Sequence, residues 1–321
     1  MISIVSNFKR VAFTLIELLV VIAIVGILSG LIVISMGGVT NKANIAKAQV
    51  FSNSLRNSLM ANIVSEWKID ELTTATEGTV IQDSWGGTNN LTLDTYVSTV
   101  DAVNKIKTGS DCVSGSCIQL DGTDDYLYSS NTATSLDFGD GTTDYPFTLG
   151  GWFKLSDVTS RGLMSKYANP DYQYLFQTYN TDRLYFFQYD DSGATYVGRY
   201  STTVLTNYEN QWIYLVATYD GSKTVAGSRI YLNGTRIDDT NFNSGTYYGM
   251  DVMNVSFRVG QYSSAAYLSG LVDDIRVFNS VMPASQIKEE YYAGLNKLLA
   301  SGSITKEDYR ERIENVAIEN N

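Results

Sequence analysis

An uncharged, mostly apolar run over residues 18–41, headed by the carboxylate of Glu17, constrains this chain more than any other feature. About 20 apolar residues suffice for a helix that spans a bilayer. An ionisable group inside such a segment costs roughly 2.5–3.5 kcal/mol on insertion scales, so its presence usually indicates a function. We therefore expect Glu17 to have a charged partner.

Lys9 and Arg10 are the only charged residues before this run and Glu17. A basic pair ahead of an apolar segment stays on the cytoplasmic side, which predicts that the rest of the chain is exported. In an ordinary secretory signal, a cleavage site of small residues follows the apolar core. Here the small residue Ala12 precedes the core, so the pattern differs from an ordinary signal.

The order of a basic pair, Ala12, the segment 13–17 and an aliphatic run resembles the class III leader of type IV pilins and pseudopilins. The resemblance implies that residues 1–12 are a leader, that a prepilin peptidase cleaves between Ala12 and Phe13, and that Phe13 is N-methylated. The precursor would cross the inner (cytoplasmic) membrane once, with its C-terminal domain outside, before entering an extracellular pilus or pseudopilus. The family usually has glycine before the cut. The alternative is a plain signal anchor whose glutamate lies at the membrane interface.

The same resemblance gives Glu17 a role in assembly. After cleavage, the amine of Phe13 is a positive charge in apolar surroundings, and Glu17 of a neighbouring subunit is expected to pair with it, so that each charge offsets the desolvation cost of the other. Gly26 and Gly30 form a small-xxx-small pattern that suits close helix approach. We expect these residues to pack against other pilin subunits in a homo- or hetero-filament.

The chain has 321 residues, enough for one sizeable core in addition to the N-terminal helix. Its net charge is −11, whereas binding to a phosphate backbone requires basic residues, so no direct nucleic-acid ligand is expected. The chain has no histidine, which excludes Ser-His-Asp and Cys-His catalysis. Glu66 and Asp70 are four residues apart, whereas glycosidases with a β-sandwich fold place their paired acids on alternate residues of a strand. We expect no enzyme; a membrane-anchored polysaccharide-active enzyme is the less favoured alternative.

The periodicity of apolar residues changes twice along the chain. Over residues 39–63, apolar residues recur every three or four positions, which predicts that the hydrophobic helix 13–38 continues as an amphipathic helix. Farther on, residues 147–155 alternate between apolar and polar, and residues 211–219 are apolar on both faces, as in a buried strand. Asn233-Gly234 joins two short strands as a hairpin turn. The predicted fold class is α+β: a long N-terminal helix followed by an all-β sandwich.

Several segments together resemble the laminin-G-like jelly roll of the concanavalin A superfamily. They are residues 66–71, 83–86, 120–126, 147–155, 212–221, 230–234 and 270–278. The resemblance covers residues 64–293 and implies that the first strand of the sandwich directly follows the long helix. Residues 294–321 resemble a short C-terminal helical module, with Thr305 and Asp308 placed as in a capping box. The alternative for this tail is a solvated, charged segment.

Cys112 and Cys117 are the only cysteines. In an exported domain, such a closely spaced pair predicts a disulfide that closes a tight loop. The alternative, a metal site, lacks ligands because two sulfurs without histidine do not complete a tetrahedral set.

Aspartates in predicted turns are candidate calcium ligands, since calcium takes six to eight oxygens and turns supply carboxylates and carbonyls. The candidates are Asp83, Asp121, Asp273 and Asp274. The resemblance implies that the strands near Asp121 and Asp273 are neighbours and that a structural calcium is common in the family. The alternative is ordinary turn chemistry without a metal.

The chain has 23 tyrosines, many of them near predicted turns. The candidates for a binding surface are Tyr167, Tyr172, Tyr174, Tyr179, Tyr189, Tyr196, Tyr247, Tyr248, Tyr262 and Tyr267. Tyrosine combines an apolar face with a polar tip, which suits sugar and protein surfaces, although it also has a high strand propensity. The leading hypothesis is a pilin-like filament subunit that displays a lectin-like domain for adhesion or surface recognition of a glycan or other surface ligand. The alternative is a minor pseudopilin with a structural role in a type II secretion or DNA-uptake machine.

Overall fold

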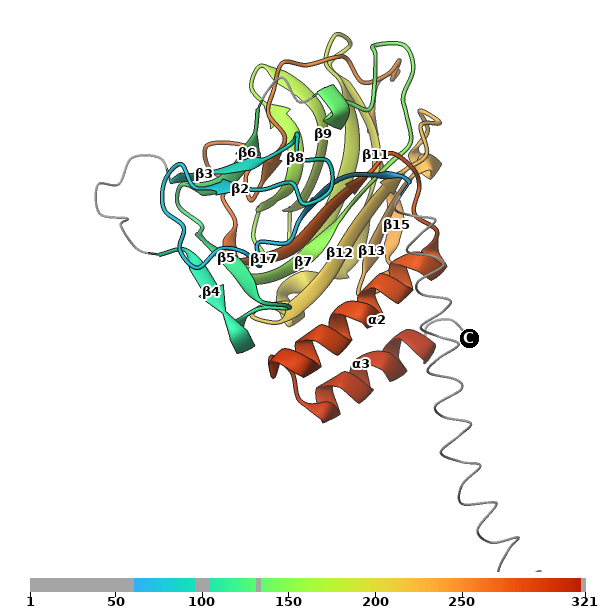
Figure 1. Cartoon of the computed structure of the whole chain (residues 1–321). Helices are drawn as coiled ribbons and strands as arrows, with labels where there is room; N and C mark the ends of the chain where they lie inside the picture. Colours follow the sequence, from blue (N-terminus) through green and yellow to red (C-terminus); the bar gives the residue numbers. More distant parts are fainter. Residues whose placement is uncertain (1–60, 96–103, 131–133, 319–321) are drawn as a thin grey trace, which may run out of the picture. The chain divides into compact units, whose positions relative to one another are not determined.

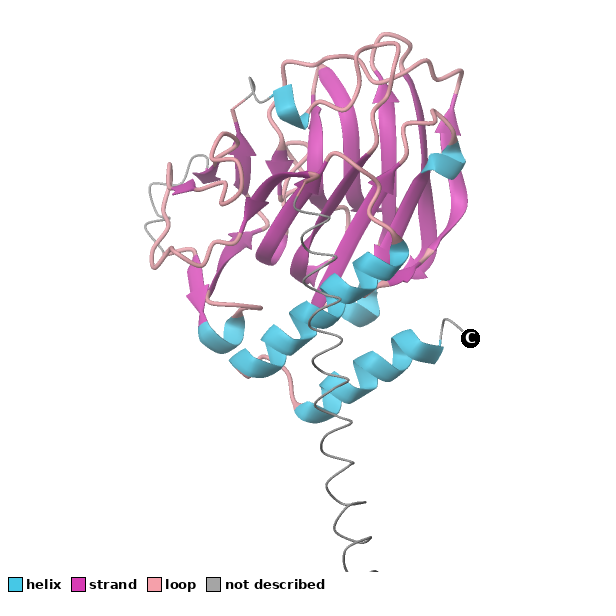
Figure 2. Cartoon of the chain, turned by 45° about the vertical axis from the view of Figure 1, so that its right-hand side comes forward, coloured by secondary structure: helices cyan, strands magenta, loops and turns pink. Residues whose placement is uncertain are grey.

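The computed structural model describes residues 61–95, 104–130 and 134–318. Over these ranges the chain forms two β-sheets packed face to face, followed by two helices at the C-terminal end (Figures 1 and 2). Ala12, Phe13, Glu17, Gly26 and Gly30, and the predicted helix up to residue 60, lie outside the described residues. In the described part, no helix is long and apolar enough to cross a membrane.

The smaller sheet, here sheet A, has eight strands that all pair antiparallel. Its order is β14 (Thr235–Arg236), β13 (Ser228–Leu232), β12 (Trp212–Tyr219), β7 (Phe147–Asp157), β17 (Ser269–Phe278), β5 (Ser116–Asp121) and β4 (Ile106–Thr108), with β1 (Ile63–Trp67) also paired to β17. The predicted hairpin at Asn233-Gly234 joins β13 to β14, and both turn residues have positive φ, 52° and 82°, as a two-residue hairpin turn requires.

The larger sheet, here sheet B, has nine antiparallel strands. Its order is β15 (Asp238–Ser244), β11 (Thr195–Val204), β10 (Arg183–Asp190), β9 (Asp171–Tyr179), β8 (Gly162–Ala168), β16 (Arg258–Val259), β6 (Asp125–Ser129), β3 (Leu91–Thr95) and β2 (Val80–Ile81). Strands that follow one another in sequence are neighbours from β8 to β11, so this half of sheet B is a meander.

The main core lies between the two sheets. Alternate residues of each strand point inward, so Leu149 and Phe153 of β7 face Phe176 and Phe186 of sheet B in one apolar cluster. Phe147 lies at its centre, with its ring 5.0 Å from that of Tyr174 and 5.8 Å from that of Phe186. The sandwich predicted from strand periodicity is therefore confirmed.

A second apolar cluster lies on the outer face of sheet A, under the helix α2 (Ala284–Ser301) and the helix α3 (Lys306–Ile318). From the sheet it takes Trp152, Tyr214 and Val216, and from α2 it takes Ile287, Tyr291, Leu295 and Leu298. This cover explains why every residue of β12 is buried: one face meets the core and the other meets α2.

The boundary predicted at residue 293 falls inside α2, so the helical tail begins ten residues earlier than expected, at Ala284. Gly294, the first residue of the predicted tail, lies within α2 and packs against sheet A. A Cβ on this residue would lie 2.1 Å from the Trp152 ring, so only glycine lets α2 approach the sheet this closely.

The capping box predicted at the start of α3 is present. Asp308 Oδ2 accepts a hydrogen bond from the Thr305 backbone N–H at 3.0 Å, and Thr305 Oγ1 accepts one from the Asp308 N–H at 3.1 Å. Val316 of α3 is buried in the cluster under α2. The tail is therefore a packed helical pair, and its alternative as a solvated segment is wrong.

The sandwich starts one residue before the predicted boundary, at Ile63 in β1. Residues 61 and 62 form a turn, so the helix predicted to reach residue 63 does not extend to it. The reason is that this segment pairs with β17, from Ile63 opposite Phe278 to Trp67 opposite Ile275, and buries Trp67 completely.

Candidate functional site

Sheet B carries a layer of aromatic rings on the face that points away from the core. In β10, Leu184 and Phe186 enter the main core, whereas Tyr185 and Phe187 point to the opposite face and belong to neither apolar cluster. These two side chains are only 4% and 6% exposed. On this face, Tyr185 contacts the rings of Tyr200 and Phe242, and Phe187 contacts those of Tyr196 and Phe242.

The rings form one connected group, which we call the aromatic face. Its members are Tyr167, Tyr172, Tyr179, Tyr185, Phe187, Tyr189, Tyr196, Tyr200, Phe242 and Tyr262. They come from β8, β9, β10, β11 and β15, and from the segment after β16. Most are half-buried.

Strand register brings these rings together. Phe187 pairs with Gly198, and Gly198 pairs with Phe242. A Cβ on Gly198 would lie 2.5 Å from the Phe187 Cβ, so the glycine leaves a gap across which the two phenylalanine rings meet at 5.2 Å. One row along the sheet, Tyr185 pairs with Tyr200, and their rings stack at 4.7 Å.

In β9, Tyr174 and Phe176 face the core. Gln173 and Gln177 alternate with them and therefore lie on the outer side of the strand, together with Leu175. Both are almost fully buried, and the Oε1 atom of each has no hydrogen-bond partner among the described residues. A buried unpaired acceptor is costly, so these two oxygens are places where a ligand hydroxyl or amine would be favourable.

Only some of the ten tyrosines named from the sequence belong to the aromatic face. Tyr167, Tyr172, Tyr179, Tyr189, Tyr196 and Tyr262 belong to the aromatic face. Tyr174 is in the main core and donates to the Leu136 carbonyl, and Tyr247 donates to the Asp144 carboxylate. Tyr267 contacts Tyr126 on β6, and Tyr248 is 67% exposed in a loop. The selection missed Tyr185, Phe187, Tyr200 and Phe242; of these, Tyr185 and Phe187 alternate with the core residues Leu184 and Phe186 in the sequence.

The predicted disulfide between Cys112 and Cys117 is confirmed, with the two Cα atoms 5.4 Å apart. Asp273 Oδ2 holds its loop by accepting from the backbone N–H groups of Val113 and Ser114, at 3.0 and 3.2 Å. Asp274 Oδ2 pairs with Lys297 of α2 at 2.6 Å. Burial and the adjacent Asp274 raise the pKa of Asp273, whereas Arg276 and Lys297 outweigh burial and lower the pKa of Asp274.

Asp83 and Asp121 also serve local turns. Asp83 Oδ1 accepts from the backbone N–H groups of Glu66 and Trp85, both at 3.1 Å. Asp121 Oδ1 accepts from those of Thr123 and Asp124, at 2.8 and 3.3 Å. Each is therefore the kind of aspartate that organises a turn without a metal.

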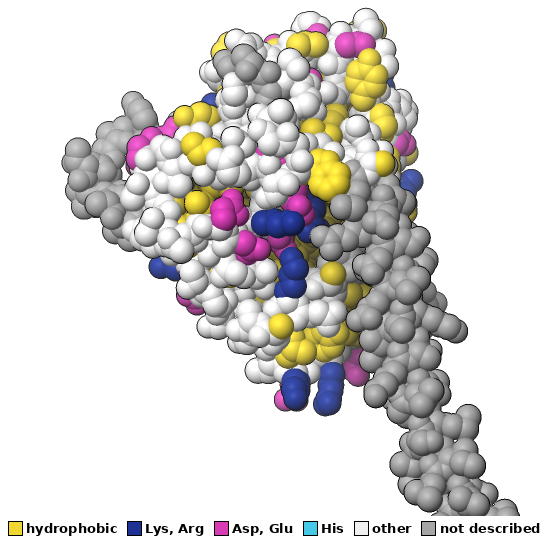
Figure 3. Space-filling view, in the orientation of Figure 1, with side chains coloured by type: hydrophobic (Ala, Val, Ile, Leu, Met, Phe, Trp, Pro, Cys, Tyr) yellow, Lys and Arg dark blue, Asp and Glu magenta, His cyan; other side chains and the backbone are white. Residues whose placement is uncertain are grey.

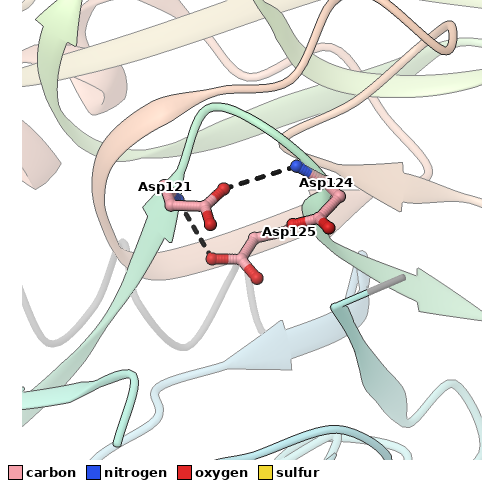
Figure 4. A group of neighbouring side chains, drawn as sticks. All are labelled: Asp121, Asp124 and Asp125. Atoms are coloured by element: carbon pink, nitrogen blue, oxygen red, sulfur yellow. Dashed lines mark hydrogen bonds between the residues drawn. The ribbon is translucent and has the colours of Figure 1, made fainter. Parts of the chain in front are cut away.

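The four predicted calcium ligands do not form one site. The strands of Asp121 and Asp273 are neighbours as expected, but Asp121 pairs with Ser269, four residues before Asp273, which separates the two by roughly 13 Å along the strand. Among the described residues, the only group of three acidic side chains close enough to share an ion is Asp121, Asp124 and Asp125 (Figure 4).

An ammonium group already lies beside that acidic group. Lys105 Nζ is 2.7 Å from Asp125 Oδ2 and 3.6 Å from Asp121 Oδ2. Burial raises the pKa of Asp125 to about 6, whereas the hydrogen bonds from Thr123 and Asp124 outweigh burial and lower that of Asp121. Since Lys105 supplies a positive charge here, these residues do not favour calcium, and calcium binding stays a prediction.

Acidic and basic side chains lie next to each other on the face shown in Figure 3. Near α2, Arg276 pairs with Glu66 at 2.8 Å and Lys297 with Asp274 at 2.6 Å, so charges of both signs are interspersed there. Glu66 and Asp70, the acids considered for catalysis, are both engaged: Asp70 accepts from the Ser116 N–H at 3.3 Å.

Two antiparallel sheets that enclose one core, with a half-buried aromatic surface on one outer face, define a lectin-like β-sandwich. The sequence comparison agrees: residues 121–288 match the family model described as the concanavalin A-like lectin/glucanases superfamily. This match covers just over half of the chain, and the protein belongs to that superfamily. The strands β1–β5 precede most of the matched range but complete both sheets. No curated protein matches the chain.

Several solved structures are similar to this chain. Domain 4 of AbnA, a GH43 extracellular arabinanase from Geobacillus stearothermophilus solved with arabinotriose, has 17% identity and a TM-score of 0.47, over 71% of this chain and 97% of that one. The binding domain of Paraclostridial Mosquitocidal Protein 1 has 16% identity and a TM-score of 0.48, over 74% of this chain and 53% of that one.

The botulinum neurotoxin serotype D binding domain has 10% identity and a TM-score of 0.50, over 74% of this chain and 52% of that one. The chain thus spans about half the length of either toxin domain. At such identities the likeness concerns the fold alone.

Proposed function

We propose that this protein is a filament subunit whose concanavalin A-like domain binds carbohydrate on the aromatic face of sheet B. The N-terminal segment, which resembles that of type IV pilins, would place the domain outside the cell. The proposal combines a binding surface among the described residues with an anchor inferred from the sequence.

The connected layer of rings, on a sheet face over which no described helix packs, is the observation that carries the binding part. Sugars have apolar C–H faces and polar hydroxyl edges, and half-buried tyrosines offer an apolar ring and a hydroxyl to match both. The unpaired Oε1 atoms of Gln173 and Gln177 add fixed acceptors beside the rings, which gives orientation as well as contact area. The half-buried rings are already held by their neighbours, so little side-chain entropy is lost on binding.

Binding without hydrolysis is the form of the proposal that Glu66 and Asp70, the acids considered for catalysis, support. Glu66 pairs with Arg276 at 2.8 Å and with Lys68 at 3.1 Å, so it has a structural role next to β17. It therefore does not offer the free pair of carboxyl groups that glycoside hydrolysis requires.

A glycan array probed with the purified full-length chain tests the binding part. We expect binding that is lost in the variant Tyr189→Ala with Tyr196→Ala and kept in Tyr292→Ala, which removes a half-buried tyrosine of α2. Absence of binding to any glycan would contradict the proposal and favour the structural role of a minor pseudopilin.

Sequencing the mature N-terminus tests the anchor. We expect it to begin at methylated Phe13; recovery of Met1 would contradict maturation. Replacement of Glu17 by Ala is expected to reduce incorporation into filaments while the glycan binding of the isolated subunit persists, because the two functions lie in different parts of the chain.

A further inference from the structure

Four aspartates lie close together at one end of the aromatic face. Asp171 begins β9, Asp190 ends β10, Asp191 follows it in the turn, and Asp251 lies in the loop after β15. The loops are joined here, since Asp251 Oδ2 accepts from the Ser192 N–H at 2.7 Å and Asp190 Oδ2 accepts from the Tyr248 N–H at 2.9 Å.

This negative charge has no basic partner in the described ranges, where no lysine or arginine forms an ion pair with any of the four aspartates. Burial, together with the charges of Asp171, Asp251 and Asp190, raises the pKa of Asp191. The electrostatic potential at this end of the face is therefore negative, in agreement with the net charge of −11 of the whole chain.

The side chain of Gln173 independently indicates a missing donor. It is completely buried, and its Nε2 donates to the Asp251 carbonyl at 2.9 Å, which places the amide beside the aspartates. The Oε1 atom of the same amide accepts no hydrogen bond within the described structure. A hydrogen-bond donor brought by a ligand would remove this deficit.

The rings of Tyr167, Tyr172 and Tyr189 lie near these carboxylates. The ring of Tyr189 is nearly perpendicular to those of Tyr172 and Tyr167, at centroid distances of 5.2 and 6.0 Å. Burial and the charge of Asp191 raise the pKa of both Tyr167 and Tyr189, so these rings stay neutral. A neutral tyrosine face attracts a cation, and the attraction adds to that of nearby carboxylates.

We propose that this end of the aromatic face binds a protonated amino group, and that the glycan recognised by the domain is an amino sugar chain with free amines. The proposal rests on the proposed function of the face in carbohydrate binding. The ammonium would donate to Gln173 Oε1 and to the carboxylates of Asp171 and Asp191, while the sugar rings would lie on the tyrosines. N-acetylation would remove the positive charge and weaken binding.

The test compares two probes that differ only in charge: an oligomer of glucosamine and the same oligomer fully N-acetylated. Binding to the full-length protein is measured by calorimetry at mildly acidic pH, where the amines are protonated. We expect the charged probe to bind at least tenfold more tightly, with an affinity that falls as salt rises.

The variant with Asp171→Asn and Asp191→Asn should lose this preference. The variant with Glu307→Gln and Glu311→Gln, which removes the same charge from exposed positions of α3, should keep it.

The other outcomes of these measurements would overturn the amine assignment, the assignment to a sugar or the proposed function, as follows. Equal binding of the two probes, with the Tyr189→Ala variant defective for both, would overturn the amine assignment and leave carbohydrate binding standing. Binding of neither probe would overturn the amine assignment, and a glycan array without hits would overturn the proposed function as well. A lysine oligomer that binds as tightly as the glucosamine oligomer would overturn the assignment to a sugar. Thermal unfolding of each variant shows whether a lost affinity reflects a lost fold, and the single variants Asp171→Asn and Asp191→Asn replace the double variant if it does not fold.

Discussion

The two outer faces of the sandwich are both rich in aromatic residues but differ in what lies on them. On sheet A, Trp152, Tyr214 and Tyr231 pack under α2 and form a second core. On sheet B, Tyr185 and Phe187 are equally buried, but belong to neither core and pack with neighbouring rings on the same face. Aromatic content alone therefore does not indicate function; the two faces differ in that described helices cover the outer face of sheet A but not that of sheet B.

Removing a ring from the covered face should give the largest effect. Tyr291→Ala deletes a side chain that is 1% exposed and stacks on Trp152 at a centroid distance of 5.8 Å. We expect unfolding in denaturant to show a loss of about 3–5 kcal/mol, the range for a buried large aromatic residue. Tyr292→Ala, on the same helix but half-buried, should cost markedly less. Equal losses for the two variants would contradict a second core under α2.

The variant Gly294→Ala tests the packing of α2 on sheet A, because helix propensity and packing predict changes in stability of opposite sign. Helix propensity alone predicts a gain of about 1 kcal/mol in stability from this change. The new Cβ would lie 2.1 Å from the Trp152 ring, so we expect a loss of about 1–3 kcal/mol from overpacking instead. Ala293→Gly, at the exposed neighbouring position, measures the propensity effect alone. A gain in stability for Gly294→Ala would mean that α2 is not held tightly against sheet A.

Removing a ring from the aromatic face should affect binding more than stability. For Tyr189→Ala we expect a change in unfolding free energy of about 1 kcal/mol or less, because the side chain is half-buried. Affinity for the glucosamine oligomer should fall at least tenfold. A large loss of stability with unchanged affinity would mean that this layer is a third core and not a binding surface.

The smallest expected effect is a pH dependence. Because the pKa of Asp191 is raised, this carboxylate becomes neutral at a higher pH than an ordinary aspartate. As pH falls through that raised value, affinity for a protonated amine should decrease a few-fold, since Tyr167 and Tyr189 are already neutral and only the aspartates change charge. Titration calorimetry over this range, with Asp191→Asn as the control, should show a flatter profile for the variant.

The raised pKa of Asp191 changes the stability of the fold with pH in the opposite direction from its effect on affinity. A carboxyl group with a raised pKa in the folded state favours folding most below its unfolded pKa, and this contribution is lost as pH rises through the folded value. Stability of the unliganded protein should therefore gain from Asp191 at acid pH, where binding is weakest. A parallel loss of stability and affinity on acidification would have to come from other groups.

Strand periodicity was sufficient to predict the sandwich, but not what covers it. Residues 211–219 are apolar on both faces, which correctly predicts a strand buried on both sides; that α2 provides the outer cover is visible only in three dimensions. The boundary at residue 293 was misplaced for the same reason, since the close approach of Gly294 to Trp152 is visible only in three dimensions.

The functional residues were predicted less well because register is not encoded locally. Asp121 and Asp273 lie on adjacent strands, as the family resemblance implied, yet their offset along β17 separates them. Tyr185 and Phe187 were missed because the selection followed turns, whereas the aromatic face is built from alternate residues in the middle of strands. The residues of the N-terminal prediction, such as Phe13 and Glu17, lie outside the described part and await the experiments above.

The entry point of the chain into the sandwich has a mechanical consequence. The Asn279 N–H donates to the Asn62 carbonyl at 2.9 Å, and the following strand, β1, pairs with β17 in the middle of sheet A. Tension applied through a tether at residue 62 would thus load a ladder of hydrogen bonds ending at the buried Trp67, with no loose hinge between them. If the proposed N-terminal anchor and the proposed ligand site on sheet B are both correct, this attachment would let the domain bear force while the ligand is held on the opposite sheet.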